Sequence, residues 1–280
     1  MSEAHRVVRH DSAAAFLAAA QAWLERDEVE NNVILSIALG LAAAPGPRVP
    51  PPYLATLLDG DAVVGCALRT PPHKVVLTRF DPRAASALAA ALHAAYPTLD
   101  AVVGPEPSVD AFAAAWAERT GVSVRRGTRQ QMYVLHAVET AASPPPGRYR
   151  GVIDDDAAML VSWIADFFHQ VGEVHLDPVA YLGERRAGIR LWEDGGPVSM
   201  AASFGQTAHG ARVSLVYTPP ALRGRGYASA CVTALSRELL MLGKRHCCLY
   251  TDLSNPISNR IYQRIGYRPV CAVSDWLLGA

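Results

Sequence analysis

One stretch constrains the fold of this chain more than any other. It begins with the strand-forming run V-S-L-V-Y at Val213, which Pro219 and Pro220 end because proline offers no N–H to a neighbouring strand. Gly224 and Gly226 follow, and apolar residues then recur at helical spacing. These residues are Val232, Leu235, Leu239 and Leu242. The stretch therefore predicts a strand, a short glycine-bearing turn and the N-terminus of a helix.

The turn between this strand and this helix has the features of an anion site. The first backbone N–H groups of a helix have no intrahelical partner and lie at the positive end of its dipole, so a diphosphate is a natural ligand there. Arg223 and Arg225 add positive charge, and Gly224 and Gly226 let a ligand approach the backbone. Two familiar phosphate loops are excluded. The chain has no G-x-x-x-x-G-K-[ST] string, and G-x-G-x-x-G fails because Ser229 stands at its third glycine.

Two motifs, taken together, resemble the GNAT superfamily of acyl-CoA-dependent N-acyltransferases. The turn matches the family's R-x-x-G-x-[GA] loop at Arg223, Gly226 and Ala228. A second motif downstream matches N-x-x-[AS]-x-x-x-Y-x-x-x-G-[FY]. Its residues are Asn255, Ser258, Tyr262, Gly266 and Tyr267. Both stand in the family's order, and the flanking strings V-Y-T-P-P and T-D-x-x-N-P-x-S-N-x-I-Y are similar to the glycine N-acyltransferase-like branch.

The resemblance implies a fold and a reaction. The fold class is α/β (α+β), with two GNAT-like domains, each a mixed, mainly antiparallel twisted sheet flanked by helices. The reaction moves an acyl group, expected to be acetyl, from acyl-CoA to an amine of a small molecule or amino acid by direct attack. The strand before the glycine turn, V-S-L-V-Y, is the family's signature strand. Its edge would pair with pantetheine, and one of its N–H groups would stabilise the oxyanion. The implied cofactor-binding residues are Leu215, Val216, Tyr217, Arg223, Gly224, Arg225, Gly226, Tyr227, Ala228, Asn255 and Asn259.

Two catalytic residues are expected. By the resemblance, Tyr262 protonates the departing thiolate, since a phenol with a pKa of about 10 is protonated at neutral pH. A tyrosine on an amphipathic helix can also be a core residue, and Asn255 can cap a helix. The base is chosen from His169, Glu173, His175 and Asp177, in a region that lines the acceptor pocket in similar proteins. Glu173 is the first choice and His175 the second, although a solvated loop explains the cluster equally well.

The chain reads as two similar halves joined by a linker. The predicted units are a domain over 1–141, a Pro-rich linker over 142–150 and a catalytic domain over 151–280. The first half has F-D-P-R-A-A-S-A where the second has P-P-A-L-R-G-R-G-Y-A, and Trp116 stands near the position of Tyr262. We therefore expect a degenerate first copy and an active second copy. Chance similarity between two α/β domains is the alternative.

Composition limits the other functions. Lys plus Arg and Asp plus Glu both number 26, so no global field attracts nucleic acid or an anionic membrane. The five cysteines form no C-x-x-C pair and the histidines are dispersed, so no metal site is expected. The N-terminus has no apolar signal region, which predicts a soluble, cytoplasmic protein. A non-catalytic CoA-binding or interaction module is the alternative function, and a homodimer is possible.

Overall fold

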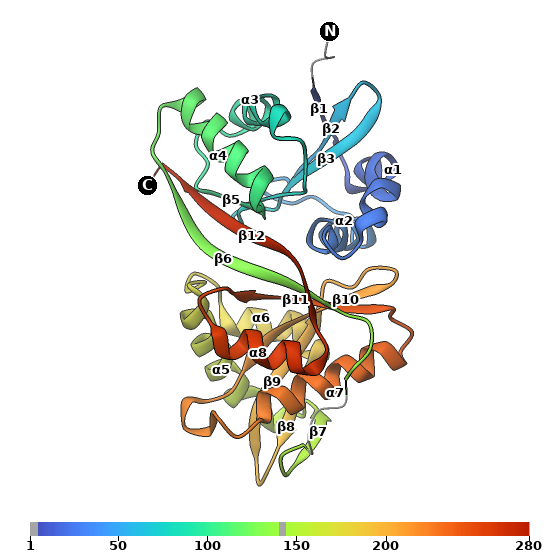
Figure 1. Ribbon diagram of the computed structural model, residues 1–280, viewed down its shortest axis with the longest axis vertical. Helices are drawn as coiled ribbons and strands as arrows, with labels where there is room; N and C mark the ends of the chain where they lie inside the picture. The colour runs from blue at the N-terminus through green and yellow to red at the C-terminus, as the bar shows by residue number, and fades with distance from the viewer. Residues whose placement is uncertain (1–4, 140–143, 280) are drawn as a thin grey trace. The chain divides into compact units, whose positions relative to one another are not determined.

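The computed structural model describes residues 5–139 and 144–279, and the same order of elements occurs twice in them (Figure 1). The first series is β1 (Arg6–Arg9), α1 (Ala13–Leu24), α2 (Asn32–Ala43), β2 (Tyr53–Asp59), β3 (Ala62–Arg69), β4 (Val75–Leu77), α3 (Ala85–Ala95), β5 (Ala101–Pro105), α4 (Glu106–Thr120) and β6 (Val124–Leu135). The second series is β7 (Arg148–Gly151), α5 (Ala157–Val171), α6 (Pro178–Arg185), β8 (Ile189–Glu193), β9 (Pro197–Phe204), β10 (Gly210–Tyr217), α7 (Tyr227–Met241), β11 (His246–Asp252), α8 (Pro256–Ile265) and β12 (Arg268–Leu278). This repeat confirms the tandem organisation expected from the sequence.

Of the described residues, the first compact unit consists of 5–132, 251–255 and 269–279. Its strands follow the order β1-β2-β3-β4-β5-β12, and among the described pairings only β4 with β5 is parallel. Alternate residues of β2 enter two cores, because Tyr53 and Leu57 pack with α3 and α4 whereas Leu54 packs with α1 and α2. Both faces of this sheet are therefore covered by helices, as its almost fully apolar strands require.

The second compact unit consists of residues 133–250 and 256–268. Its strands follow the order β6-β11-β10-β9-β8-β7, and β10 with β11 is its parallel pair. One core lies between the sheet and the helices α7 and α8. A second core lies on the other face, between the sheet and the helices α5 and α6. The predicted class, an α/β fold with mixed, mainly antiparallel strands flanked by helices, is confirmed.

The compact units do not follow the contiguous boundaries expected from the sequence. The last strand, β12, completes the sheet of the first unit, where Leu277 pairs with Ala101 of β5. The last residues of β6 belong to the second unit instead, since Tyr133 and Leu135 pack in the core of α7 and α8. Each half of the sequence therefore gives its final strand segment to the sheet of the other half.

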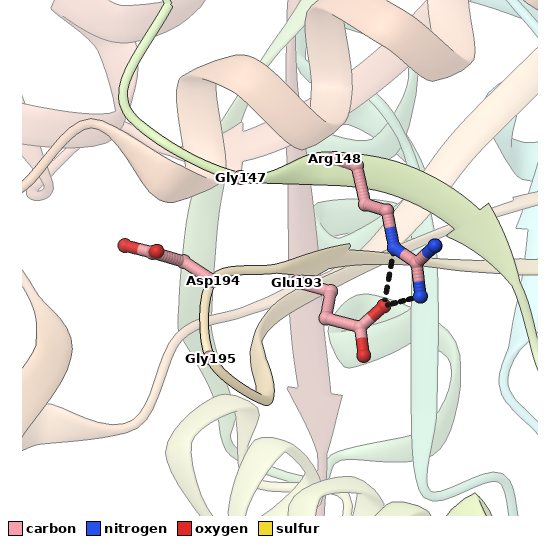
Figure 2. Close-up of a pocket in the computed structure, with 5 residues that line it drawn as sticks. All are labelled: Gly147, Arg148, Glu193, Asp194 and Gly195. Carbon is pink, nitrogen blue, oxygen red and sulfur yellow. Dashed lines mark hydrogen bonds and ion pairs between the residues drawn. The ribbon is translucent and has the colours of Figure 1, made fainter.

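The linker is also shorter than the predicted 142–150, because β7 begins at Arg148. Residues 142–143 lie outside the described residues, and the three prolines that follow are irregular, as expected. Gly147 is held against the β8–β9 hairpin, where the indole nitrogen of Trp192 donates to the carbonyl of Pro146 at 3.0 Å. Gly147, Arg148, Glu193, Asp194 and Gly195 line a pocket of about 480 Å³ at this hairpin (Figure 2).

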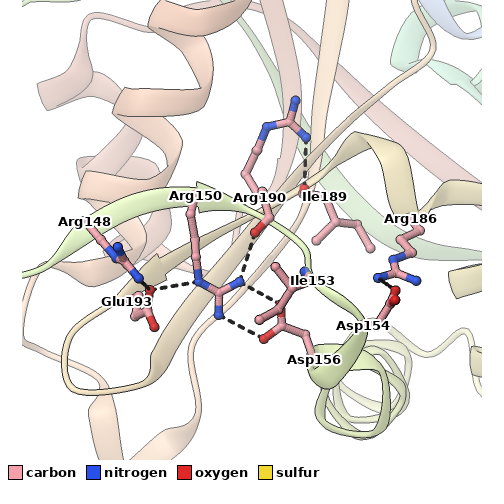
Figure 3. A network of polar contacts seen from close by, with 10 residues as sticks. Arg148, Arg150, Ile153, Asp154, Asp156, Arg186, Ile189, Arg190 and Glu193 are labelled. Carbon is pink, nitrogen blue, oxygen red and sulfur yellow. Dashed lines mark hydrogen bonds and ion pairs between the residues drawn. The ribbon is translucent and has the colours of Figure 1, made fainter.

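Ion pairs explain why β7 forms a strand within the predicted linker. The guanidinium of Arg150 lies between two carboxylates, with Nε 2.9 Å from Glu193 and the terminal nitrogens 2.7 and 2.9 Å from Asp156 (Figure 3). Asp156 also accepts the N–H of Ile153 at 2.8 Å, which fixes the turn into α5. Arg150 and Asp156 are 16% and 6% exposed, so this pair ties β7 to the start of α5 in a largely buried setting.

The remaining differences from the sequence prediction are local. The elements β1 and α6 were not predicted. Within residues 5–139 and 144–279, no helix has the length and apolar character needed to cross a membrane.

Candidate active site

A bulge shapes the signature strand β10. Its pairing with β9 shifts between Ser214 and Tyr217, and Leu215 adopts the left-handed conformation, with φ of +53°. Before the bulge, Val213 packs on the side of α7 and α8. After it, Leu215 and Tyr217 pack on the side of α5 and α6. The extra residue in the bulge thus changes the face of the sheet to which alternate side chains of β10 point. It also interrupts the hydrogen bonds between β10 and β9 in the strand that is expected to bind the oxyanion.

The parallel strands β10 and β11 separate at this bulge. Their pairing runs only from Gly210 with His246 to Arg212 with Cys248, although β10 continues to Tyr217. The edge of β10 that faces β11 is therefore released from this pairing over its last five residues. An extended chain such as pantetheine can add to an edge of this kind as a further strand.

The predicted diphosphate loop lies between β10 and α7 and is exposed from Arg223 to Gly226. Gly224 and Gly226 have φ values of +80° and +83°, a region that favours glycine, and Gly226 is the N-cap of α7. The first N–H groups of α7 follow directly, at Tyr227 and Ala228. The loop thus presents exposed glycine backbone directly before the N-terminus of α7.

Two side chains at this loop have assigned partners. Arg223 donates from Nε to the carbonyl of Thr218 at 3.0 Å and from a terminal nitrogen to Gln170 of α5 at 3.3 Å. Tyr227 is buried and its hydroxyl donates to Asp194 at 2.6 Å, which places this phenol beside the pocket in Figure 2. Of the predicted cofactor-binding groups, Tyr227 can thus offer its backbone N–H rather than its side chain.

Tyr262 lies on α8, on the core side of the sheet shared with α7. Its side chain is 8% exposed, and burial raises the pKa of the phenol to about 12. Its ring packs edge to face with Tyr267 at 6.0 Å, and the described residues offer its hydroxyl no hydrogen-bond partner. The group is therefore protonated at neutral pH and its O–H is available to a ligand.

A tyrosine that was not predicted holds the helix that carries Tyr262. The hydroxyl of Tyr133, on β6, lies 3.1 Å from Asn259 Oδ1 and accepts the side-chain N–H of Gln263 at 3.2 Å. Asn259 and Gln263 are one helical turn apart and flank Tyr262. Asn259, predicted to bind the cofactor, thus also has a structural partner. Asn255 belongs to the segment 251–255 of the first unit, in a turn where its N–H bonds to the carbonyl of Asp252.

The predicted base lies in the connection between α5 and α6. Glu173 follows the end of α5, where its N–H bonds to the carbonyl of Phe168 at 2.9 Å. Its carboxylate is partly exposed and lies 3.5 Å from Nε2 of His175, so the first and second choices for the base are neighbours. His169 is exposed, and Asp177 caps α6 through a bond to the N–H of Val179. These residues lie on the α5 and α6 side, opposite to the helices α7 and α8.

Polar groups around the end of β10 were also missed in the sequence. Ser199 donates to the carbonyl of Tyr217 at 3.0 Å and accepts the hydroxyl of Thr218 at 2.9 Å, and all three residues are buried. The hydroxyl of Tyr217 donates to Asp166 of α5 at 2.7 Å. A single carboxylate beside the apolar stripe of α5 is the one sequence signal for Asp166, and it does not specify a partner across the sheet.

The corresponding region of the first unit is closely packed. A Cβ built at Gly104 of β5 would lie 2.8 Å from the carbonyl oxygen of Leu77, so β4 and β5 stay in close contact at the end of β4. Phe80 then bonds through its N–H to the hydroxyl of Ser108, on α4, at 2.8 Å, and both are buried. Asp81 accepts the N–H of Arg83 at the start of the next helical turn. Asp81 and Arg83 stand between β4 and α3, a segment that corresponds in element order to the diphosphate loop between β10 and α7.

Comparison with known proteins finds one matching family model and several similar folds. Residues 188–277 match the family model described as FR47-like protein. A protein of known structure from Drosophila is 15% identical and superposes with a TM-score of 0.69 over 98% of each chain. A GNAT-family acetyltransferase from Colwellia psychrerythraea is 12% identical, with a TM-score of 0.57 over 98% of this chain and 100% of that one. No curated protein matches the chain.

A third solved structure has the same tandem organisation. It is described as a tandem GNAT protein from the clavulanic acid biosynthesis pathway, is 14% identical and gives a TM-score of 0.55 over 99% of each chain. At these identities the likeness concerns the fold. The chain therefore has the GNAT fold, in a tandem arrangement whose second series of elements carries the segment that matches the FR47-like family.

Proposed function

We propose that the second unit is an N-acyltransferase that moves an acyl group, acetyl in the first instance, from acyl-CoA to an amine of a small molecule or amino acid. The observation that carries this proposal is the separation of β10 from β11 beside a glycine loop that opens α7. A released strand edge and a helix N-terminus, one after the other in the chain, suit an amide-bearing arm that ends in a diphosphate.

Each part of this site would have one task. Backbone N–H groups from Gly224 to Ala228 would bind the diphosphate, with Arg225 as the exposed cation. An N–H at the bulge around Leu215 would stabilise the oxyanion, a contribution worth about 3 kcal/mol per donor. The unusual backbone conformation of Leu215 supports this role, because it turns a peptide group away from the regular ladder.

Proton transfers would fall to residues on the two faces of the sheet. The amine nitrogen forms a bond to the thioester carbon, the carbon–sulfur bond breaks, and the thiolate takes the phenolic proton of Tyr262. Glu173 would receive the proton of the amine, through water. Tyr262 lies on the side of α7 and α8, and Glu173 follows α5 on the other side. This placement suits a reaction in which donor and acceptor approach from opposite faces.

We propose further that the first unit is a degenerate copy that binds no acyl-CoA. Its support is the contact between Gly104 and Leu77, the Ser108 bridge to Phe80, and the carboxylate of Asp81 at the turn. Calorimetry with acetyl-CoA should therefore give one site per chain. Two equivalent sites would contradict this assignment.

The deciding experiment combines binding and turnover. Acetyl-CoA binding is measured by calorimetry, and coenzyme A release is measured with a thiol reagent over a panel of amines that includes glycine. Gly226→Val places a β-branched residue at φ of +83°, where only Pro145 lies nearby, at 3.8 Å, and should abolish binding without unfolding the chain. Binding without turnover of any amine would favour the non-catalytic module, and unchanged binding in Gly226→Val would remove the loop from the cosubstrate site. Turnover of glycine would support the glycine N-acyltransferase-like branch.

A further inference from the structure

We propose that Asp166, held in place by Tyr217, binds the acceptor amine in its cationic form, so that the acceptor is an amine protonated at neutral pH. This inference rests on the proposed function and adds the charge class of the acceptor. Its basis is the exposed carboxylate of Asp166, which a hydrogen bond fixes beside Tyr217 at the end of β10. This part of β10 is no longer paired with β11.

The position of Asp166 is set by buried contacts. Its Oδ2 lies 2.7 Å from the hydroxyl of Tyr217, whose side chain is 3% exposed. The ring of Tyr217 packs against Trp163, one turn earlier on α5, with centroids 5.8 Å apart. The carboxylate is thus anchored by a residue of the signature strand itself, two positions after the bulge at Leu215.

A second contact fixes the same face of α5 to the diphosphate loop. Gln170 stands four residues after Asp166, so the two side chains lie on one face of the helix. Gln170 accepts from Arg223 at 3.3 Å, and Arg223 also donates to the carbonyl of Thr218 at 3.0 Å. The face of α5 that carries Asp166 therefore covers both the end of β10 and the start of the loop.

The side of the sheet indicates which substrate would meet this carboxylate. The diphosphate loop opens α7, and Tyr262 lies on the face of α7 and α8. Tyr217 and Trp163 pack on the opposite face. A thioester that reaches the end of β10 from the loop leaves this opposite face to the acceptor. Asp166 lies on this face, beside Tyr217.

The charge of Asp166 remains available to a ligand. Among the residues that the structure describes, Tyr217 is its one assigned hydrogen-bond partner, and no ion pair involves it. The nearby cation Arg223 is instead directed to Thr218 and Gln170. A carboxylate has about four lone-pair positions, of which the tyrosine uses one. The rest can accept the N–H groups of an ammonium, the form that alkyl amines with pKa near 10 take at neutral pH.

The test compares charged and uncharged acceptors in the full-length protein. Asp166→Asn keeps the size of the side chain and removes its charge. Glu184→Gln, an exposed carboxylate on α6, is the matched control for a general change of field. The acceptors are a primary alkylamine and an arylamine that is neutral at the same pH. For each variant, the KM of each amine, the KM of acetyl-CoA and the thermal midpoint are measured at low and high salt.

We expect Asp166→Asn to raise the KM of the alkylamine about tenfold or more, as the loss of a charge-assisted hydrogen bond predicts, and to remove its salt dependence. The KM of acetyl-CoA and the kinetics of the arylamine should change less than about twofold. Tyr217→Phe, which keeps the carboxylate and frees it, should raise the alkylamine KM by a smaller factor. If Asp166→Asn folds poorly, Asp166→Glu supplies the comparison, since it keeps the charge and should restore most of the alkylamine preference.

The outcomes separate this inference from the proposed function. An unchanged alkylamine KM in Asp166→Asn, or equal losses for the charged and the neutral amine, overturns the role of Asp166 while the acyltransferase remains. A wild-type protein that binds acetyl-CoA and turns over no amine overturns the proposed function itself.

Discussion

Replacing Tyr262 by phenylalanine separates catalysis from stability at one side chain. The substitution removes a hydroxyl that has no hydrogen-bond partner among the described residues and leaves an 8% exposed ring in place. The free energy of unfolding should therefore change by less than about 1 kcal/mol. If this phenol donates the proton to the departing thiolate, kcat should fall about 100-fold to 10,000-fold, which corresponds to about 3 to 5 kcal/mol of transition-state energy.

Tyr267 provides the matched control at the end of the same helix. Its hydroxyl lies 2.9 Å from that of Ser236, and both residues are fully buried in the core of α7 and α8. Tyr267→Phe removes this bond and leaves the serine hydroxyl without its partner, at a cost of about 1 to 2 kcal/mol of stability. Its kcat should change little. Each substitution removes one tyrosine hydroxyl. Tyr262→Phe should lower kcat with little change in stability, and Tyr267→Phe should lower stability with little change in kcat.

The assay is the pH dependence of coenzyme A release together with denaturant unfolding of both variants. Burial raises the pKa of Tyr262 to about 12, so the acid stays protonated and should cause no alkaline loss of rate below about pH 11. The wild-type rate could instead fall near about pH 10, the ordinary tyrosine pKa, and Tyr262→Phe could abolish that fall. This result would refute the raised pKa of Tyr262. Equal kcat in Tyr262→Phe and wild type would refute the acid role.

Two further predictions concern the scaffold. Arg150 lowers the pKa of Asp156 through hydrogen bonds, so their pair stabilises the fold above the ordinary carboxyl pKa and loses its effect as the pH falls through the lowered one. Arg150→Ala should thus cost about 2 kcal/mol near neutral pH, less at acid pH, by urea unfolding; an equal cost at both would contradict the pairing. A fragment of residues 144–280 should lack cooperative thermal unfolding, because residues 133–135 are missing from its core. Adding residues 124–139 as a separate peptide should restore part of this cooperativity.

The sequence predicted those features that follow from local chemistry. Pro219 and Pro220 end the signature strand β10, and α7 begins at Tyr227 directly after the glycine turn, as the sequence indicated. The helix of Tyr262 was placed by its apolar period and its motif. Each of these depends on residues fewer than about ten positions apart, within reach of pattern rules.

What could not be predicted depends on pairing between distant segments. The bulge at Leu215 arises from the register of β10 against β9, and leucine gives no sign of a positive φ. The placement of β12 beside β5 depends on a partner more than 160 residues away, which the order of motifs does not reveal. The same holds for Tyr133 and Asp166, whose partners lie on elements that only the folded sheet brings near.

The contrast between the two units gives a physical reason for their different fates. Among the described pairings, each unit has one parallel pair, which is β4 with β5 in the first unit and β10 with β11 in the second. In the second unit a bulge and two prolines carry β10 away from β11. In the first unit β4 is three residues long, and the hydroxyl of Ser108 satisfies both the N–H and the carbonyl of Phe80. Opening that seam would leave two buried backbone groups unpaired, at a cost of about 1 to 3 kcal/mol each, before any ligand bound. A ligand that had to open this seam would lose that energy from its affinity, which is the physical reason for the proposal that the first unit binds no acyl-CoA.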